Sequence, residues 1–416
     1  MENIIIAKNT FPILKIEKFP KKNKLSFIQD IDNTFEVEKV KDNEIGDLYE
    51  DYARIQFKDI LTKAVYKDAS DVHIEPFDDE VVIRIRVDGK LSKILTIAKK
   101  SYSSLTTVIK LDSGMNITEK RLPQDGVMEK KIDDTILDIR TSTIPTIYGE
   151  KIVLRILNRQ SLIKEKSELG FSKKAIEKIE NIIDKKSGIL LVTGSTGSGK
   201  TTTVYSILKD LLNIGKNIMT IEDPVEYKIK GINQIQVNEK VGLTFDVGLR
   251  SILRQDPDII MVGEIRDVET AKTAIRAAST GHLVISTMHT NDAISSINRL
   301  IEMNLAPYLI SSTLIGIISQ KLVRRKCNDC DINLEIEDLH ENTDVLCEKC
   351  EDTGYHGRSA MYEILEVSES LKEYINNWQD RHNISDSYIK DEMITFNESA
   401  KYLIENNITT EEECLI

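Results

Sequence analysis

The sequence predicts an α/β protein, in which helices cover a mostly parallel sheet, preceded by a smaller α+β domain. After about residue 165, short apolar runs alternate with helical patterns, and this alternation is typical of a parallel sheet. The first of these runs leads through a glycine-rich turn into a helix. Before residue 160 the hydrophobic pattern instead has the period of two that is typical of strands.

Several structural units are expected, because 416 residues exceed the size of an ordinary single domain. The pattern divides the chain into a short leader over residues 1–46, a small α+β domain over 47–160, the α/β domain over 165–325, a cysteine module over 326–362 and a helical region over 363–416. The leader has no sustained hydrophobic period, so we interpret it as small or partly disordered.

Composition argues against two classes of protein. The net charge of −12 disfavours a general nucleic-acid-binding surface, because proteins that follow a phosphate backbone concentrate positive charge. No apolar run reaches the roughly 18 residues that span a bilayer, and Met1–Ile6 lacks the basic start of a signal peptide. We therefore expect a cytoplasmic protein that reaches the membrane only through partners.

The small domain is predicted to begin with a helix and to continue as strands. A helical pattern covers Asp47–Lys67. Apolar and polar residues then alternate in three segments, Val82–Val87, Ile136–Thr141 and Lys151–Leu157. Asp88-Gly89 follows the first segment and is a strong hairpin signal, and a second such pair, Asp125-Gly126, precedes the next segment.

A phosphate-binding loop is predicted where the α/β domain begins. Gly194, Gly199, Lys200 and Thr201 satisfy the pattern G-x-x-x-x-G-K-[ST]. The glycines let backbone N–H groups approach phosphate oxygens, the lysine neutralises the β/γ-phosphates, and the threonine hydroxyl can bind Mg²⁺. The residues expected to contact the nucleotide are Gly194, Ser195, Thr196, Gly197, Ser198, Gly199, Lys200, Thr201 and Thr202.

Carboxylates follow two of the predicted strands. These strands are Ile189–Val192, Ile218–Ile221, Ile259–Val262 and Leu283–Ile285, and ligands of a parallel sheet bind at the carboxyl ends of its strands. Glu222 ends the second strand and Glu264 follows the third. Either one alone is as consistent with a helix cap, but phosphate hydrolysis needs one carboxylate to hold Mg²⁺ and another to orient water. The pair therefore favours a catalytic interpretation.

One histidine and five arginines are further candidates. His289 lies past the end of the fourth strand, where a side chain that senses the γ-phosphate would lie, whereas His282 begins that strand and is interpreted as structural. Arginine stabilises the charge that hydrolysis spreads over the γ-phosphate oxygens. The candidates are Arg250, Arg254 and Arg266 in the α/β domain and Arg140 and Arg155 in the small domain. If one of the last two reaches the nucleotide, domain closure becomes coupled to ATP.

Four of the five cysteines predict a structural zinc site. Cys327 and Cys330 form one close pair, and Cys347 and Cys350 form another after sixteen intervening residues. Four sulfur ligands leave no position for a reactive water, so the metal is expected to be structural. Paired cysteines in this spacing also fit a reducing compartment better than a disulfide framework.

These features together resemble the hexameric ATPases of type II secretion and type IV pilus assembly. The resemblance covers about Asp51–Glu366 and includes further motifs besides the phosphate loop: Ala69–Pro76, Arg84–Gly89, Lys120–Gly126, the acidic box Glu222–Glu226, Gly263–Asp267 and the histidine box Gly281–Asp292. It implies a RecA-like ATPase domain preceded by a PAS-like domain. The tetracysteine module favours an assembly or secretion motor over a retraction motor.

The resemblance also implies roles for the candidates. The residue that matches Glu264 is the Walker B acid, and the one that matches Glu222 activates water. Arg140 and Arg155 match arginines that the small domain contributes, while Arg250, Arg254 and Arg266 match residues that line the nucleotide site. The cofactors are then ATP, Mg²⁺ and Zn²⁺. The partners are a homo-hexamer, an inner-membrane platform protein and a membrane-anchored recruitment protein, with no direct nucleic-acid partner.

The resulting hypothesis is a motor at the cytoplasmic face of the inner membrane, in which ATP hydrolysis moves the small domain and the platform protein. Pilus assembly, protein secretion and DNA uptake are equally compatible with these residues. A nucleic-acid translocase is a rival that the acidic composition disfavours. A scaffold that binds ATP without hydrolysing it is another, and the full set of catalytic residue types disfavours it.

Overall fold

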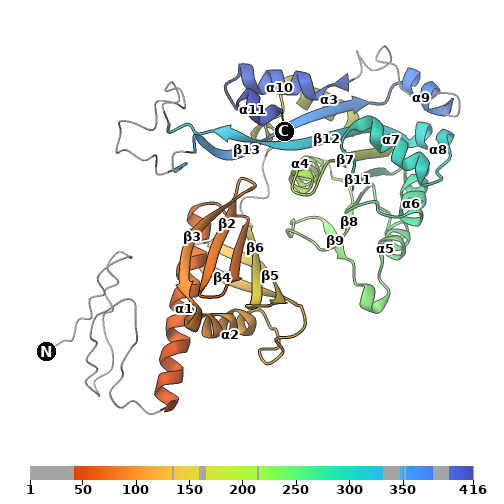
Figure 1. Cartoon of the computed structure of the whole chain (residues 1–416). Helices are drawn as coiled ribbons and strands as arrows, with labels where there is room; N and C mark the ends of the chain where they lie inside the picture. Colours follow the sequence, from red (N-terminus) through yellow and green to blue (C-terminus); the bar gives the residue numbers. More distant parts are fainter. Residues whose placement is uncertain are drawn as a thin grey trace.

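The computed structural model describes residues 42–133, 135–158, 165–212, 215–330, 347, 349–350, 353–377 and 393–415. Two sheets organise these residues (Figure 1). We refer to residues 42–158, built on a six-stranded sheet, as the small domain and to residues 165–415, built on an eight-stranded sheet, as the large domain. Most of the predicted leader lies outside the described residues.

The small domain consists of two helices packed on an antiparallel sheet. Its elements are α1 (Asp42–Tyr66), β1 (Asp71–Pro76), β2 (Glu80–Val87), β3 (Lys90–Ala98), α2 (Tyr102–Asp112), β4 (Gln124–Ile132), β5 (Thr135–Thr146) and β6 (Gly149–Asn158). The strand order is β3-β2-β1-β6-β5-β4, and each neighbouring pair is antiparallel. Apolar residues of α1 and α2 pack with one face of the sheet in a single core. The predicted helix and the alternating strands are confirmed.

The two Asp-Gly pairs have different roles. Asp88 and Gly89 have φ angles of 47° and 85° and connect β2 to β3, which confirms the predicted hairpin. Asp125-Gly126 instead lies inside β4. A Cβ atom on Gly126 would lie 2.3 Å from the carbonyl oxygen of Ser113. This glycine therefore permits close packing between β4 and the end of α2 rather than a turn.

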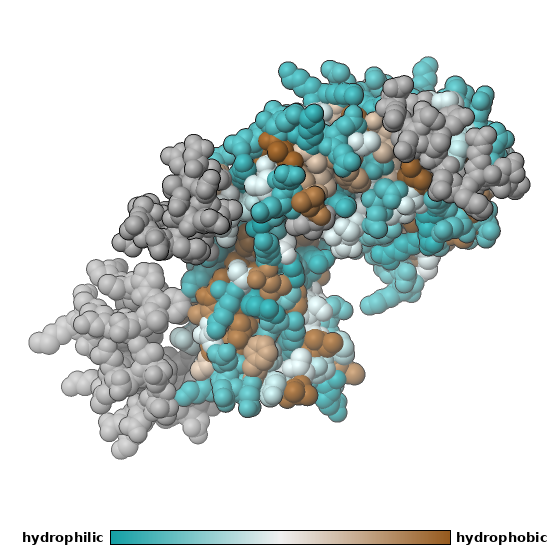
Figure 2. Space-filling model, turned by 45° about the horizontal axis from the view of Figure 1, so that its top comes forward, coloured by the Kyte–Doolittle hydropathy of each residue, from teal (hydrophilic) through white to brown (hydrophobic). Residues whose placement is uncertain are grey.

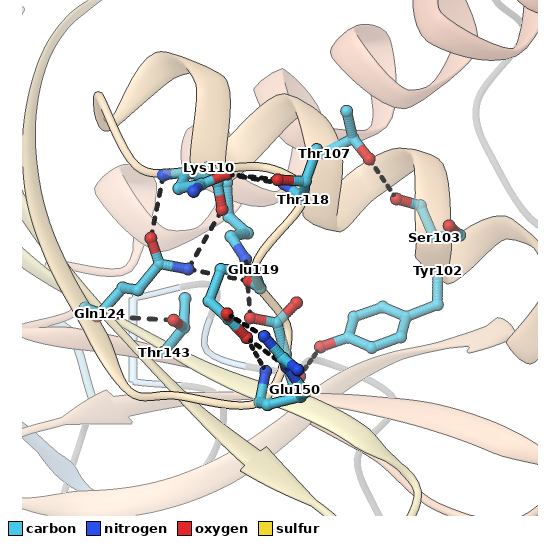
Figure 3. A network of polar contacts seen from close by, with 11 residues as sticks. Tyr102, Ser103, Thr107, Lys110, Thr118, Glu119, Gln124, Thr143 and Glu150 are labelled. Atoms are coloured by element: carbon cyan, nitrogen blue, oxygen red, sulfur yellow. Dashed lines mark hydrogen bonds and ion pairs between the residues drawn. The ribbon is translucent and has the colours of Figure 1, made fainter.

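A buried ion pair fixes the segment between α2 and β4 (Figure 3). Lys110 is 1% exposed, and its Nζ atom lies 2.8 Å from Oε1 of Glu150, which is also buried. The same ammonium donates to the carbonyl oxygen of Glu119 at 2.5 Å, and the Gln124 amide donates to that oxygen at 2.9 Å. These bonds hold the motif Lys120–Gly126 against the domain and leave Leu122 exposed.

The large domain has a parallel central sheet with an antiparallel edge. Its strands are β7 (Gly188–Thr193), β8 (Ile218–Glu222), β9 (Asn233–Gln236), β10 (Ile259–Val262), β11 (Leu283–Met288), β12 (Leu314–Lys326), β13 (Tyr355–Glu366) and β14 (Met393–Ile394), in the order β14-β13-β12-β7-β11-β10-β8-β9. The pairs from β12 to β9 are parallel, whereas β13 and β14 pair antiparallel. All four predicted strands are present.

Helices cover both faces of this sheet. They are α3 (Lys173–Ile183), α4 (Lys200–Leu212), α5 (Phe245–Ile252), α6 (Val268–Ser279), α7 (Ala293–Glu302), α8 (Pro307–Thr313), α9 (Glu369–Asn376), α10 (Phe396–Glu405) and α11 (Glu411–Cys414). Ile189 and Leu191 of β7 pack with α5 to α9, while Leu190 and Val192 pack with α3 and α4. Because both faces of β7 are buried, its sequence is an unbroken apolar run and does not alternate.

The central sheet continues into the segment predicted as the cysteine module. β12 ends at Lys326, and β13 begins at Tyr355 and pairs with β12 along its length. The cysteine pairs therefore lie in the connection between the two strands of a long hairpin that belongs to the large sheet. Among the described residues, no helix is both long and apolar enough to cross a membrane.

Hydrogen bonds and ion pairs join the two domains. Arg140 of β5 forms an ion pair with Glu226, which follows β8. Asp88, in the β2–β3 turn, accepts a hydrogen bond from the backbone N–H of Gly357 at 2.8 Å and lies 3.4 Å from Nε of Arg358. The surface is hollowed where the domains meet (Figure 2), and this hollow leads to the loop between β7 and α4.

Candidate functional site

The loop between β7 and α4 has the backbone of a phosphate cradle. Gly194, Gly197 and Gly199 have φ angles of 143°, 80° and 87°, a region that favours glycine. A Cβ atom on Gly194 would lie 2.3 Å from the carbonyl oxygen of Gln320 on β12. The Ser198 hydroxyl is buried and has no hydrogen-bond partner among the described residues. The loop therefore offers backbone N–H groups and an uncommitted hydroxyl next to the N-terminus of α4.

Lys200 is held inside this loop. Its Nζ atom donates to the carbonyl oxygens of Gly194 and Ser195, at 2.7 and 2.9 Å. The side chain is 9% exposed, and burial lowers the pKa of its ammonium, while the charge of Glu264 acts in the opposite direction. A partly desolvated ammonium at the base of a glycine loop fits the binding of a polyphosphate.

Glu264 and His289 meet at the carboxyl ends of neighbouring strands. Glu264 follows β10 and His289 follows β11, and Oε2 of Glu264 lies 3.3 Å from Nε2 of His289. The other oxygen of Glu264 is 2.5 Å from Arg266, and this hydrogen bond raises the pKa of the guanidinium. The Glu264 side chain is only 12% exposed. The predicted histidine and one of the predicted arginines thus both contact the predicted Walker B acid.

The surroundings of Glu222 differ from those expected for a base that activates water. It is 3% exposed, and its carboxylate accepts hydrogen bonds from the hydroxyls of Tyr205 and Thr220 and from the Gln234 amide. Burial and the nearby Glu222 charge raise the pKa of the Tyr205 hydroxyl, so this donor keeps its proton. Three donors occupy the oxygens that a base would turn toward water.

The five candidate arginines are not gathered around the loop. Arg155 lies 3.2 Å from Asp71 in its own domain and lines the cleft, whereas Arg140 crosses to Glu226. Arg250 pairs with Asp246 on α5, and Arg254 donates to the Arg250 carbonyl and to Ser251. Neither Arg250 nor Arg254 lines the cleft that contains the loop. Within one chain, these two therefore lie outside the nucleotide cleft.

The cleft between the domains has a volume of about 1310 Å³ and is lined by residues of both. Thr196–Thr203, Glu264 and His289 line it from the large domain, and Asp88 and Arg155 from the small domain. Gly194, Ser195 and Arg266 are not among the residues that line it. His282 is away from it: its Nδ1 atom lies 2.9 Å from the carbonyl oxygen of Ala277 at the end of α6.

The four predicted cysteine ligands come together. Their sulfur atoms all lie within 4.8 Å of one another, with Cys327 and Cys347 at 3.9 Å and Cys330 and Cys350 at 3.1 Å. A tetrahedral zinc site with Zn–S bonds of about 2.3 Å places its sulfurs roughly 3.8 Å apart, so the donor set fits zinc. The backbone N–H of Cys350 lowers the pKa of the Cys347 thiol to about 7, whereas burial raises the pKa of the Cys330 and Cys350 thiols.

Two residues of the site were not singled out from the sequence. Glu222 and Glu226, at the two ends of the acidic box, both line the cleft, but Glu226 is half-exposed whereas Glu222 is buried. Tyr205 lies on α4, and its hydroxyl donates to Glu222 and accepts from the Glu226 backbone N–H at 3.3 Å. Tyr205 is buried on α4, and no local sequence pattern reveals its polar partners.

Known proteins resemble this chain over most of its length. A family model described as "Type II/IV secretion system protein" matches residues 50–416. The chain is 45% identical over 384 residues to the type IV pilus assembly ATPase PilB of Thermus thermophilus, covering 89% of this chain and 43% of that protein. It is 42% identical over 356 residues to the type II secretion system protein HxcR of Pseudomonas aeruginosa, covering 86% and 75%.

Solved structures give a matching fold. The pilus retraction motor PilT with bound ADP is 27% identical, with a TM-score of 0.59 over 86% of this chain and 95% of that one. The ATPase DotB of Legionella pneumophila is 22% identical, with a TM-score of 0.65 over 87% and 94%, and supports the fold alone. The chain thus spans less than half the length of the Thermus relative and most of the length of the solved structures.

Proposed function

The chain belongs to the type II/IV secretion system protein family, a family of ATP-hydrolysing enzymes, and on that premise we propose that it binds Mg·ATP at Gly194–Thr202 and hydrolyses it. One observation carries the proposal. The loop after β7, Glu264 after β10 and His289 after β11 all line one cleft, which the small domain closes from the other side. Ligands of parallel sheets bind at this edge.

Each residue has a distinct role in this proposal. Lys200 and the loop N–H groups bind the phosphates, and the ATP-bound Mg²⁺ supplies charge neutralisation at the γ-phosphate. The Thr201 hydroxyl and the Glu264 carboxylate would hold the metal, and His289 contacts Glu264 from the neighbouring strand and would orient it. Arg266 offsets the negative charge of Glu264.

The water-activating carboxylate is proposed to be Glu226 rather than Glu222. The carboxylate of Glu222 already accepts three hydrogen bonds in a buried site. Glu226 lines the cleft and is held by Arg140 of the small domain. A movement of the small domain that withdraws Arg140 would free Glu226 to orient water. Glu222 then acts as the buried anchor of the acidic box.

The biological role is proposed from the relatives. Their names describe type IV pilus assembly and type II secretion. We propose that this chain powers the assembly of a pilus or secretion pseudopilus as a homo-hexamer. It would act at the cytoplasmic face of the inner membrane through a platform protein and a membrane-anchored recruitment protein. In such a ring, Arg250 and Arg254 would reach the nucleotide site of a neighbouring copy, and DNA uptake by the same type of motor is the alternative.

ATP turnover in the assembled oligomer tests the chemistry. Lys200→Ala and Glu264→Ala should each lower turnover at least about 100-fold, because they remove phosphate and metal contacts of the transition state. Lys209→Ala is the matched control, since Lys209 is an exposed lysine on the same helix. Near-normal rates in both site variants would refute the proposal. Glu226→Gln should abolish turnover while preserving nucleotide binding.

A further inference from the structure

Gln320 connects the phosphate loop to a strand that neither the loop motif nor the catalytic candidates include. It lies on β12, is 1% exposed, and uses both ends of its amide. Nε2 donates to the carbonyl oxygen of Ser198 at 2.6 Å, and Oε1 accepts from the Thr203 hydroxyl at 2.8 Å. Among the described residues, no other side chain of β12 donates a hydrogen bond to the loop.

The register of the sheet places Gln320 where the loop begins. β12 runs parallel to β7 with Ser319 opposite Thr193, so Gln320 lies beside Gly194. Successive side chains on a strand point to opposite faces. Ser319 accordingly donates to the carbonyl oxygen of Asn291 in the histidine box, at 3.1 Å, while Gln320 reaches the loop. The absence of a side chain on Gly194 lets the loop pack directly on the β12 backbone.

The bond to Ser198 determines the orientation of a neighbouring amide. A trans peptide unit is planar, and its C=O and N–H bonds point in opposite directions. The peptide unit that carries the Ser198 oxygen also carries the N–H of Gly199. When Gln320 holds that oxygen toward β12, the Gly199 N–H points away from β12 and toward the interior of the loop. Gly199 has a φ of 87°, a conformation that glycine adopts readily because it has no side chain.

From this geometry we infer that Gln320 is a positioning residue for phosphate binding, which acts by aiming the Gly199 N–H. The inference rests on the proposed nucleotide site. The amide is suited to this task because it donates to the loop and accepts from α4 at the same time. Thr203 belongs to the first turn of α4, and its backbone N–H donates to the Gly199 carbonyl. Gln320 therefore fixes the loop relative to the helix.

Three variants distinguish the effect of the bond to Ser198 from that of the bond to Thr203. Gln320→Met keeps the length of the side chain and removes both bonds. Gln320→Glu, when ionised, retains an acceptor for Thr203 but cannot donate to the Ser198 carbonyl. Thr203→Val removes the bond to α4 and leaves the bond to Ser198. The dissociation constants of ADP and of a non-hydrolysable ATP analogue with Mg²⁺ are measured by calorimetry on the full chain, together with KM and kcat for ATP.

We expect Gln320→Met and Gln320→Glu to raise the dissociation constants and KM by about 3- to 10-fold, the range of one net hydrogen bond. Thr203→Val should raise them by less than about 2-fold. Thermal unfolding without nucleotide checks that all three variants fold. Equal effects of Thr203→Val and Gln320→Met, or wild-type affinity in Gln320→Met, would overturn the inference. If the wild-type chain itself binds no nucleotide, the proposed function fails as well.

Discussion

Arg140 and Glu226 form a two-point ion pair between the domains, with Nη2 2.7 Å from Oε2 and Nη1 3.3 Å from Oε1. Arg140 comes from the sheet of the small domain, and Glu226 from the acidic box beside the nucleotide loop. Any displacement of the small domain that breaks this pair exposes a carboxylate in the cleft. The pair therefore links the position of one domain to the chemistry proposed for the other.

Arg140→Ala should loosen the attachment of the small domain. Both side chains are 29% exposed, so the pair contributes about 0.5–1 kcal/mol, which shifts the ratio of docked to undocked chains by about 2- to 5-fold. The distribution of distances between spin labels in the two domains should broaden. Arg155→Ala is the control, since its partner Asp71 lies in the same domain. An identical broadening in both variants would contradict this assignment.

Glu222→Ala should destabilise the large domain more than Glu226→Ala does. Loss of the buried carboxylate leaves the hydroxyls of Tyr205 and Thr220 without their acceptor, at a cost of about 2–4 kcal/mol, while the Gln234 amide keeps a bond to a backbone carbonyl. Glu226 is half-exposed, and its loss should cost less than about 1 kcal/mol. Denaturant unfolding measures both. If Glu222→Ala lowered the free energy of unfolding less than Glu226→Ala does, the hydrogen-bonded network would contribute little to stability.

Removal of the four clustered thiols should abolish zinc binding. The sulfurs of Cys327, Cys330, Cys347 and Cys350 are close enough to share one ion, so we expect one zinc per chain by mass spectrometry of metals. A quadruple Cys→Ser variant should contain none and should melt at a lower temperature, because the β12–β13 hairpin loses its closure. Cys414→Ser, on α11 outside the cluster, should retain the metal. Undiminished zinc in the quadruple variant would reject this ligand set.

Glu363 should make the stability of the large domain fall as the pH rises from about 4.5 to about 7. Burial raises the pKa of this carboxyl from 4.5 to about 7. In that window the folded state holds a proton that the unfolded state has released, so the free energy of unfolding decreases with pH, by roughly 3 kcal/mol in all. Above the window both states are ionised and the decrease ends.

Glu363→Gln should remove this dependence. The amide oxygen can still accept from the backbone N–H of Ala293, as Glu363 does at 3.1 Å, and it carries no charge. The variant should therefore be more stable than the wild type at pH 8 and similar at pH 4. Unfolding by denaturant at several pH values is the measurement, and parallel profiles for the two proteins would exclude a buried titrating carboxyl.

Local sequence was sufficient to predict the strand, loop and helix that contain the phosphate-binding residues. The apolar run before Gly194 and the glycines after it specify a strand, a loop and a helix within about a dozen residues, so no distant part of the chain is needed to recognise them. The spacing of the cysteine pairs was equally informative, because the two pairs of a tetrahedral site are each close in sequence.

The roles of the two acidic-box glutamates could not be predicted from sequence alone. Glu222 and Glu226 are four residues apart and chemically identical. Only the positions of Tyr205 on α4 and of Gln234 on β9 decide that the first is buried and fully hydrogen-bonded. The Asp125-Gly126 pair shows the same limit: its sequence favours a turn, but packing against Ser113 keeps it in a strand.

The amino-acid order by itself determined the strand and helix pattern, the phosphate loop and the four sulfur ligands, because periodicity and backbone preference act between near neighbours. Tertiary structure alone decided that Gln320 reaches the Ser198 carbonyl, that Arg140 reaches Glu226, and that the cysteine hairpin extends the central sheet. Those contacts join residues 86 to 122 positions apart, or depend on which strands become neighbours. Such proximity is set by burial of both faces of a shared sheet, which acts across the whole chain.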